Sequence, residues 1–327
     1  MTTDLQNTIQ KKADEYFEYM VQIRRHLHKN PEVSFKEFDT TDYVLHELKK
    51  MKIETQRPME TGCLGIIRGD DSDRVIALRT DIDALPMDEV GEAKSEFISE
   101  RPGAAHCCGH DGHTANLLGT AKILTDLKDQ IDGTIVLIFQ PGEEKLPGGG
   151  RKLTETGALQ KLGVQEVYGL HTNPNYMPGQ VAVKPGPLMA CTVEFDVTIH
   201  GKGGHAAAPH TAVDPIVLAS QIITQFQTIV SRSMDPTEPA VITVGKIEAG
   251  SAFNVIPENA RMLGTVRAFS METARFIKNR MEEVIKGATD GAGATYTFEF
   301  VEGYPAVIND EAVYGKCSFS RKKHIRR

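Results

Sequence analysis

Three apolar segments, each followed by acidic residues or a histidine, constrain the fold of this chain more than any other feature. They are residues 74–80, 133–140 and 166–170, followed in turn by Asp81 and Asp83, by Glu143 and Glu144, and by His171. The nearly continuous apolar runs are typical of strands buried on both faces of a parallel sheet. Helices are expected between the strands, at residues 115–127 and 153–162, so the pattern predicts an α/β domain. Functional groups in such domains gather outside the carboxyl ends of the strands, and we expect a polar site there.

The stretch HCCGHDGHT, which begins at His106, places thiol and imidazole groups together just before one of these helices. Cys108 and His110 are two residues apart and can reach one cation or a close pair, with the sulfur and nitrogen donors that zinc prefers. Taken singly, each of these groups is also compatible with a purely structural role: a helix start with incidental histidines and a buried thiol, turn caps, a solvated loop, or a core histidine. Because the acids and His171 all follow strand ends, we interpret the whole set as one metal site.

The N-terminal segment has the spacing of amphipathic helices. Apolar residues recur at helical intervals from about Asp4 to Lys29, where Pro31 prevents continuation, and this pattern predicts one helix. A second helix is expected from about Glu37 to Met51. At 327 residues the chain exceeds a typical single domain, so two domains are expected.

After Pro185 the order of elements changes, and the pattern predicts a second kind of domain. Strands are expected at residues 192–200, 240–248, 259–269 and 295–301, and helices at residues 212–230 and 271–286. Strand, helix, strand, strand, helix, strand is the order of a ferredoxin-like α+β module. We therefore expect residues 1–185 to form the first part of one domain, residues 186–301 to form an inserted module, and residues 302–327 to return to the first domain.

Charge and composition exclude several classes of protein. A net charge of −7 gives no electrostatic basis for nucleic-acid binding. The polar N-terminus lacks the apolar core of a signal peptide, and no apolar run approaches the length of a membrane span. Five cysteines, an odd number with Cys107 and Cys108 adjacent, do not suggest a disulfide framework. A cytoplasmic protein with reduced thiols and no membrane or nucleic-acid partner is the expectation.

Seven motifs, in this order, give the chain a recognisable resemblance: RRHLHKNPEVSF, RTDIDALPM, HCCGHDGHT, FQPGEE, GLHTNP, GKGGHAAAPH and GSAFNVIPE. The sequence resembles the metal-dependent aminoacylase and carboxypeptidase superfamily, in particular its branch of hippurate hydrolases, auxin-conjugate amidohydrolases and N-acyl-amino-acid deacylases. The resemblance implies a di-metal exopeptidase-like catalytic domain with an inserted ferredoxin-like lid that also forms a homodimer.

The resemblance also implies roles for individual residues. Cys108, His110, Glu144 and His171 would bind two divalent metal ions, zinc or manganese in the first place, with cobalt or nickel as alternatives. Glu143 would be the general base, and Asp83 would orient a ligand. In the lid, His205 would stabilise the oxyanion, often in the partner's active site, while Asn254 and Arg267 would bind polar groups of the substrate.

The end of the chain departs from this resemblance. Related enzymes continue further and supply a last histidine ligand, whereas here a basic sequence follows Tyr314 and contains only His324. We therefore expect a C-terminal truncation that weakens the metal site. The predicted function is hydrolysis of the amide bond of N-acyl amino acids or small peptides. Alternatives are a non-catalytic or weakly active remnant without the last ligand, and a dipeptidase or carboxypeptidase of the same superfamily.

Overall fold

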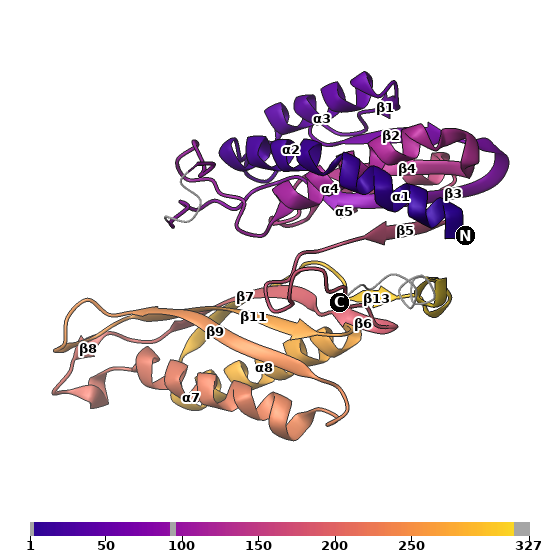
Figure 1. Ribbon diagram of the computed structural model, residues 1–327. Helices are drawn as coiled ribbons and strands as arrows, with labels where there is room; N and C mark the ends of the chain where they lie inside the picture. Colours follow the sequence, from indigo (N-terminus) through magenta and orange to yellow (C-terminus); the bar gives the residue numbers. More distant parts are fainter. Residues whose placement is uncertain (1–2, 92–95, 317–327) are drawn as a thin grey trace. The chain divides into compact units, whose positions relative to one another are not determined.

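The computed structural model describes residues 3–91 and 96–316, and the chain divides into two compact units (Figure 1). The units are Met1–Pro178 and Gly179–Arg327, each with its own hydrophobic core. The predicted boundary at residue 185 lies slightly further along the chain than the observed one. The three-part division, with residues 302–327 returning to the first domain, stays a prediction. His324 and most of the basic end lie outside the described residues.

The first unit is built on a mixed sheet whose strand order is β1-β2-β4-β3-β5. The strands are β1 (Glu54–Gln56), β2 (Cys63–Arg68), β3 (Asp70–Asp81), β4 (Asp132–Gln140) and β5 (Glu166–Gly169). β3 pairs in parallel with both β4 and β5, whereas β2 is antiparallel to β4 and β1 is antiparallel to β2. The three predicted strands are therefore the parallel ones, and their carboxyl ends meet at one edge of the sheet. The antiparallel strands β1 and β2 were not predicted.

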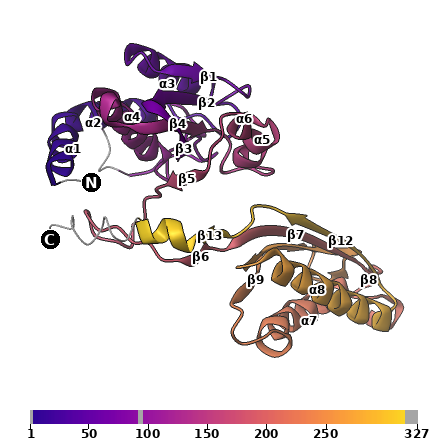
Figure 2. The ribbon, with the colours of Figure 1, turned by 90° about the vertical axis from the view of Figure 1, so that its right-hand side faces the viewer.

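Helices cover both faces of this sheet (Figure 2). They are α1 (Thr3–Glu15), α2 (Phe17–Lys29), α3 (Phe38–Lys50), α4 (His110–Asp126), α5 (Gly149–Glu155) and α6 (Ala158–Lys161), with a 3-10 turn at Lys128–Gln130. One core joins α2, α3 and α4 to Leu137 and Phe139 of β4, and a second joins α5 and α6 to Val136 and Ile138 of the same strand. β4 is thus buried on both faces, as expected. β5 is not, because it lies at the sheet edge and leaves Val167 53% exposed.

The predicted helix from Asp4 to Lys29 is two helices in the structure. The break lies at Tyr16, whose backbone angles (φ −93°, ψ 6°) depart from helical values. Its hydroxyl donates a hydrogen bond to Asp126 at the end of α4, and Lys12 bonds the same carboxylate at 2.6 Å. These tertiary contacts have no counterpart in the apolar periodicity. The second predicted helix is confirmed as α3.

The second unit is a four-stranded antiparallel sheet, with order β12-β7-β11-β9, covered by two helices. Its main elements are β7 (Cys191–His200), α7 (Pro215–Thr228), β9 (Ala240–Ala249), β11 (Asn259–Ala268), α8 (Met271–Ala292) and β12 (Thr295–Glu302). Phe226 of α7 and Met281 of α8 pack into one core with Phe195 and Met262 of the sheet. The predicted order of strands and helices, and with it the ferredoxin-like module, is confirmed.

Smaller elements complete the second unit. They are β6 (Gly186–Met189), β8 (Gly204–His205), β10 (Val255–Ile256) and β13 (Val307–Asn309), with a 3-10 turn at Pro209–Thr211 and a π-helical turn at Ile229–Ser233. β8 pairs with β10, and β6 pairs with β13. In the part of the chain that the structure describes, every helix is too short or too polar to cross a lipid bilayer.

Candidate metal centre

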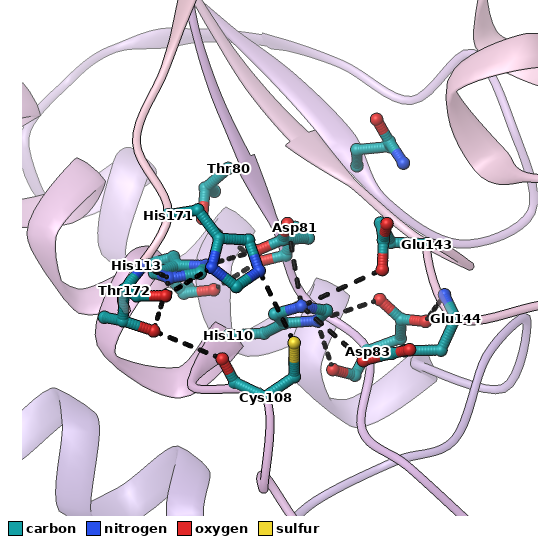
Figure 3. Close-up of polar contacts among 12 residues, drawn as sticks. Thr80, Asp81, Asp83, Cys108, His110, His113, Glu143, Glu144, His171 and Thr172 are labelled. Atoms are coloured by element: carbon teal, nitrogen blue, oxygen red, sulfur yellow. Dashed lines mark hydrogen bonds and ion pairs between the residues drawn. The ribbon is translucent and has the colours of Figure 1, made fainter. Parts of the chain in front are cut away.

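The carboxyl edge of the parallel strands in the first unit carries a cluster of sulfur, nitrogen and oxygen ligand atoms (Figure 3). Three groups have all their ligand atoms within 4.8 Å of one another: Cys108, His110 and His171; His110, Glu143 and Glu144; and Asp81, His110 and His113. The four predicted ligands fall within the first two groups, with the predicted base beside them. His110 belongs to all three groups and lies at the centre of the cluster.

His110 is fully buried at the start of α4, and its hydrogen bonds define which nitrogen faces the cluster. Its Nδ1 lies 2.8 Å from the backbone carbonyl of Asp83. Because a carbonyl can only accept, Nδ1 donates, and in the neutral ring the lone pair is on Nε2. Nε2 lies 3.8 Å from Glu144 Oε1, 3.7 Å from Asp81 Oδ2 and 4.0 Å from Glu143 Oε2.

The electrostatics around His110 favour a cation. Burial acts to lower the pKa of His110, but the adjacent Asp83 and Cys108 side chains and the charge of Asp81 outweigh it and raise the pKa to about 11. The same surroundings therefore stabilise positive charge in a place that water reaches poorly. A divalent cation satisfies this requirement as a proton does.

Cys108 and His171 form the second group of ligand atoms. Cys108 Sγ lies 3.4 Å from His171 Nε2, while His171 Nδ1 donates to the carbonyl of Thr172 at 2.6 Å. The neighbouring His110 and the hydrogen bond from His171 lower the pKa of Cys108, and the bond to Cys108 raises the pKa of His171 to about 9. The thiolate is thus favoured. Sulfur and nitrogen ligands of one tetrahedral zinc lie roughly 3.5 Å apart, so the observed spacing suits a shared ion.

Asp83 connects this cluster to the loop that follows β4. Its Oδ2 accepts from Ser34 Oγ at 2.7 Å and from the main-chain N–H of Glu144 at 2.9 Å. Burial raises the pKa of Asp83, but hydrogen bonds from His110, Glu144 and Ser34 outweigh burial and lower the pKa. The loop is held from its other side by the buried Glu37, whose Oε1 accepts the N–H of Gly142 at 2.7 Å.

Glu143 and Glu144 follow each other but have different surroundings. The side chain of Glu144 is 19% exposed and that of Glu143 is 34% exposed. Burial and the charge of Glu144 raise the pKa of Glu143, which makes it a better proton acceptor than an ordinary carboxylate. The more buried Glu144 is suited to hold a cation, and the more exposed Glu143 is suited to exchange protons.

Buried atoms without hydrogen-bond partners test whether the cluster fits a metal. Among the described residues, His110 Nε2, Glu144 Oε1 and Asp83 Oδ1 are buried side-chain atoms of this cluster without a hydrogen bond. Native proteins rarely leave buried polar atoms unsatisfied, and a cation bound between them would satisfy the first two directly. The mixture of thiolate, imidazole and carboxylate donors suits a borderline-soft divalent ion. The residues present therefore fit a metal.

Three further groups of the site were given no individual role from the sequence: Asp81, which was only counted among the strand-end acids, His113 and Thr172. Asp81 Oδ1 and His113 Nδ1 lie 2.7 Å apart, and His113 Nε2 accepts the N–H of Thr172 at 2.8 Å. Burial acts to raise the pKa of Asp81, but the His113 hydrogen bond and the Arg79 charge hold it well below its usual range. The sequence did contain a signal for His113, because His113 follows His110 by three residues and shares its helix face.

The second unit holds the remaining predicted residues, and its geometry separates them. His205 in β8 pairs with Val255, and the carbonyl of Asn254 accepts the N–H of Ala206 at 3.2 Å, so His205 and Asn254 lie together. Arg267 lies in β11 at the end that pairs with Thr192. The opposite end of β11 leads to the segment that carries Asn254, roughly 25 Å away at strand geometry. Arg267 therefore does not share a subsite with His205 in this unit.

Comparison with known proteins places the chain in a family. The sequence profile described as peptidase family M20/M25/M40 matches residues 77–322, most of the chain. The chain belongs to peptidase family M20/M25/M40. The match covers every residue labelled in Figure 3 and most of the second unit. The resemblance seen in the motifs and the expected fold class are confirmed.

Three similar members of the M20 family illustrate its range. An N-acyl-L-amino acid amidohydrolase of Geobacillus stearothermophilus is 42% identical, over 92% of this chain and 80% of its own length. Thermostable carboxypeptidase 2 of Saccharolobus solfataricus is 38% identical, over 95% of this chain and 79% of its own. The solved structure of Bacillus subtilis YXEP, a dinuclear metal-binding M20 peptidase, is 35% identical, with a TM-score of 0.78 over 95% of this chain and 80% of its own.

Proposed function

We propose that this chain is a metal-dependent hydrolase that cleaves the amide bond of an N-acyl amino acid or a small peptide. The observation that carries the proposal is the cluster around His110, where a thiolate and an imidazole on one side face a pair of glutamates on the other. Membership of the M20 family supports it, because similar members are named as amidohydrolases and carboxypeptidases. The products would be a carboxylate and an amine.

Cys108, His110, Glu144 and His171 would hold two divalent metal ions, as the dinuclear relative from Bacillus subtilis supports. Zinc or manganese are the proposed ions, with cobalt or nickel as alternatives, because these accept thiolate, imidazole and carboxylate ligands together. When bound, such ions polarise the scissile carbonyl and make water more acidic. Glu143 and Glu144, which lie next to His110, supply negative charge that balances the ions, as does the Cys108 thiolate.

Glu143 would act as the general base. Its raised pKa and its partial exposure beside His110 suit a carboxylate that accepts a proton from the attacking water. The same carboxyl group then donates this proton to the leaving nitrogen, so that the protons balance. Asp83 would position two groups. Its carboxylate lies beside Nδ1 of His110, and it accepts the main-chain N–H of Glu144.

The second unit would contribute substrate recognition. His205 is exposed and its Nδ1 accepts the N–H of Ala207 at 3.0 Å, so Nε2 is the nitrogen available to a substrate oxygen. Asn254 lies beside it, and both are proposed to contact polar groups of the substrate. Arg267 is proposed as a separate recognition residue. A homodimer formed through this unit, with His205 serving the partner's site, is part of the proposal. Sedimentation at micromolar concentrations tests the dimer.

A carboxypeptidase or dipeptidase activity is the second candidate, and it is favoured by the 38% identity to the carboxypeptidase of Saccharolobus solfataricus. The two candidates differ in the group on the amino side of the scissile bond. N-acyl amino acids carry a neutral acyl group there, whereas dipeptides carry a free ammonium. If a single site cleaved both classes of substrate, the two candidates would differ only in their relative rates of cleavage.

The test is a hydrolysis assay on metal-loaded protein, with N-acetyl and N-benzoyl amino acids and dipeptides of matched side chains. The matched control is Glu143→Gln, which keeps the ligands and removes the base. Cleavage of acylated substrates by the parent chain, abolished in the control, supports the proposal. Cleavage of dipeptides alone would favour the second candidate. A protein with full metal content that cleaves neither class would contradict both candidates and leave the non-catalytic remnant.

A further inference from the structure

We propose that His113 is a positioning residue, whose Nε2 holds the main chain of Thr172 and thereby sets the place of His171 opposite Cys108. The proposal concerns residues of a single cluster in the first unit, all drawn in Figure 3. It rests on the proposed function only in taking His171 as a metal ligand. The hydrogen bonds themselves involve no metal.

The donor and acceptor roles of His113 follow from its partners. A main-chain N–H can only donate, and that of Thr172 lies 2.8 Å from His113 Nε2, so this nitrogen accepts. The proton of His113 is then on Nδ1, 2.7 Å from Asp81 Oδ1. Both ring nitrogens are engaged. His113 has a ligand atom within reach of Asp81 and His110, yet its lone pair is directed to Thr172 and not to a shared cation.

His171 needs such support because it lies on an exposed segment. β5 ends at Gly169, and residues 170–178 are all exposed. Few apolar contacts hold a segment of this kind, and such segments open at low free-energy cost. The hydrogen bonds of Thr172 connect it to the buried part of the site: its N–H reaches His113, and its Oγ1 donates to the carbonyl of Cys108 at 3.2 Å.

Asp81 connects His113 to the sheet. Its Oδ2 accepts from Arg79 at 2.8 Å, and its backbone carbonyl accepts from Thr114 Oγ1 at 3.0 Å. Asp81 ends β3, so its carboxylate is fixed relative to the strand next to β5. Asp81, His113 and Thr172 thus form a chain of hydrogen bonds from the end of β3 to the segment after β5. This chain lies beside the 3.4 Å contact between Cys108 and His171, and the rings of His113 and His171 are 4.7 Å apart.

Close packing against Gly109 further restricts where Thr172 can lie. Gly109 precedes α4 with φ +92°, and a Cβ on it would lie 2.6 Å from Thr172 Oγ1. Thr172 is therefore in contact with the turn that carries Cys108 and His110. A shift of the segment that bears His171 would directly change the distance between Cys108 Sγ and His171 Nε2.

Two isosteric variants separate the two ring nitrogens. In His113→Gln the side-chain oxygen reaches the place of Nε2 and can still accept the Thr172 N–H. In His113→Asn the amide reaches only the place of Nδ1 and leaves Thr172 without its acceptor. Thr172→Val removes the Oγ1 contacts with the Cys108 carbonyl and His113 Nε2 but keeps the N–H, so it measures the share of the hydroxyl separately. Thermal unfolding of each variant shows whether it remains folded.

The first readout is hydrogen exchange of the Thr172 amide in metal-free protein. We expect exchange about tenfold faster in His113→Asn, and close to the parent rate in His113→Gln. This measurement needs neither substrate nor metal, so its result does not depend on hydrolytic activity. Equal exchange rates in the parent and His113→Asn would overturn the proposal, whatever the chain hydrolyses.

The second readout is metal affinity. We expect His113→Asn to bind metal roughly 10- to 100-fold more weakly than the parent, with most of the affinity retained in His113→Gln. In the background of His171→Ala, His113→Asn should change the remaining affinity less than about twofold, because the residue it positions is gone. A loss of similar size in both backgrounds, or equal losses in Gln and Asn, would identify His113 as a ligand and overturn the proposal.

Discussion

The two sides of the metal centre are held by different means. His110 and the Glu143–Glu144 loop lie over the carboxyl end of β4, which is buried on both faces, and they are fixed by Asp83 and Glu37. His171 follows an edge strand and is exposed. The first side is held by buried carboxylates beside a packed strand, and the second depends on a few hydrogen bonds around the exposed Thr172. Variants on the two sides should therefore fail in different ways.

The largest expected effect is on catalysis at the packed side. Glu143→Gln removes the proton acceptor while leaving the ligands and the fold intact. Turnover should fall by roughly 10²- to 10⁴-fold with metal content unchanged. Steady-state kinetics and metal analysis on one preparation check this. If metal content fell with turnover, Glu143 would be a ligand and the division of roles between the two glutamates would be wrong.

Ligand removal should affect both sides, but differently. Glu144→Ala and Cys108→Ala each remove a negatively charged ligand, so each should lose bound metal on dialysis. On the exposed side the His171 segment should also become more mobile in Cys108→Ala, because the 3.4 Å contact is lost. Metal analysis of both variants and hydrogen exchange of residues 170–178 test these two expectations. Full metal content in both variants would refute the ligand assignment.

Gly109→Ala tests the contact between the two sides. Left-handed backbone costs a residue with a Cβ about 1–2 kcal/mol, and the new Cβ would also collide with Thr172 Oγ1. We expect lower stability by denaturant unfolding and faster exchange in the His171 segment. Adding Thr172→Ser should not relieve this, because the hydroxyl remains, whereas Thr172→Gly should relieve the collision. Equal stability of Gly109→Ala and the parent would contradict the packing described.

Glu37→Ala should weaken metal binding less than the loss of a ligand or of the His113 contact does. It leaves the buried N–H of Gly142 without its acceptor, at a cost of about 1–3 kcal/mol in stability. Because packing around β4 remains, metal affinity should change by less than in His113→Asn. Glu37→Gln keeps an acceptor oxygen and is the matched control. A larger loss of metal affinity in Glu37→Ala than in His113→Asn would reverse the comparison between the two sides.

That the proposed ligand residues lie together could be predicted from sequence because each follows a strand or lies at or just before the start of a helix that periodicity reveals. The apolar run before Glu143 and the motif around Cys108 place these groups at one sheet edge. The supporting contacts could not be predicted in this way. His113 and Thr172 are 59 residues apart and meet through a main-chain N–H, which no side-chain pattern encodes.

The fold shows the same limits. The ferredoxin-like order was predicted because its strands alternate clearly, whereas β1 is short and fully exposed and left no pattern. The break at Tyr16 coincides with a hydrogen bond to Asp126, a tertiary partner 110 residues away. Burial of β5 was overestimated because an apolar run does not reveal whether its strand lies at the edge.

Anomalous diffraction from zinc-loaded crystals would test the central claim most directly. The account predicts two peaks at the carboxyl edge of β3, β4 and β5, coordinated by Cys108, His110, Glu144 and His171. It also predicts that His113 Nε2 stays on the Thr172 N–H and outside the roughly 2.1 Å ligand distance of zinc. A peak coordinated by His113, or no peak within reach of Cys108, would contradict it.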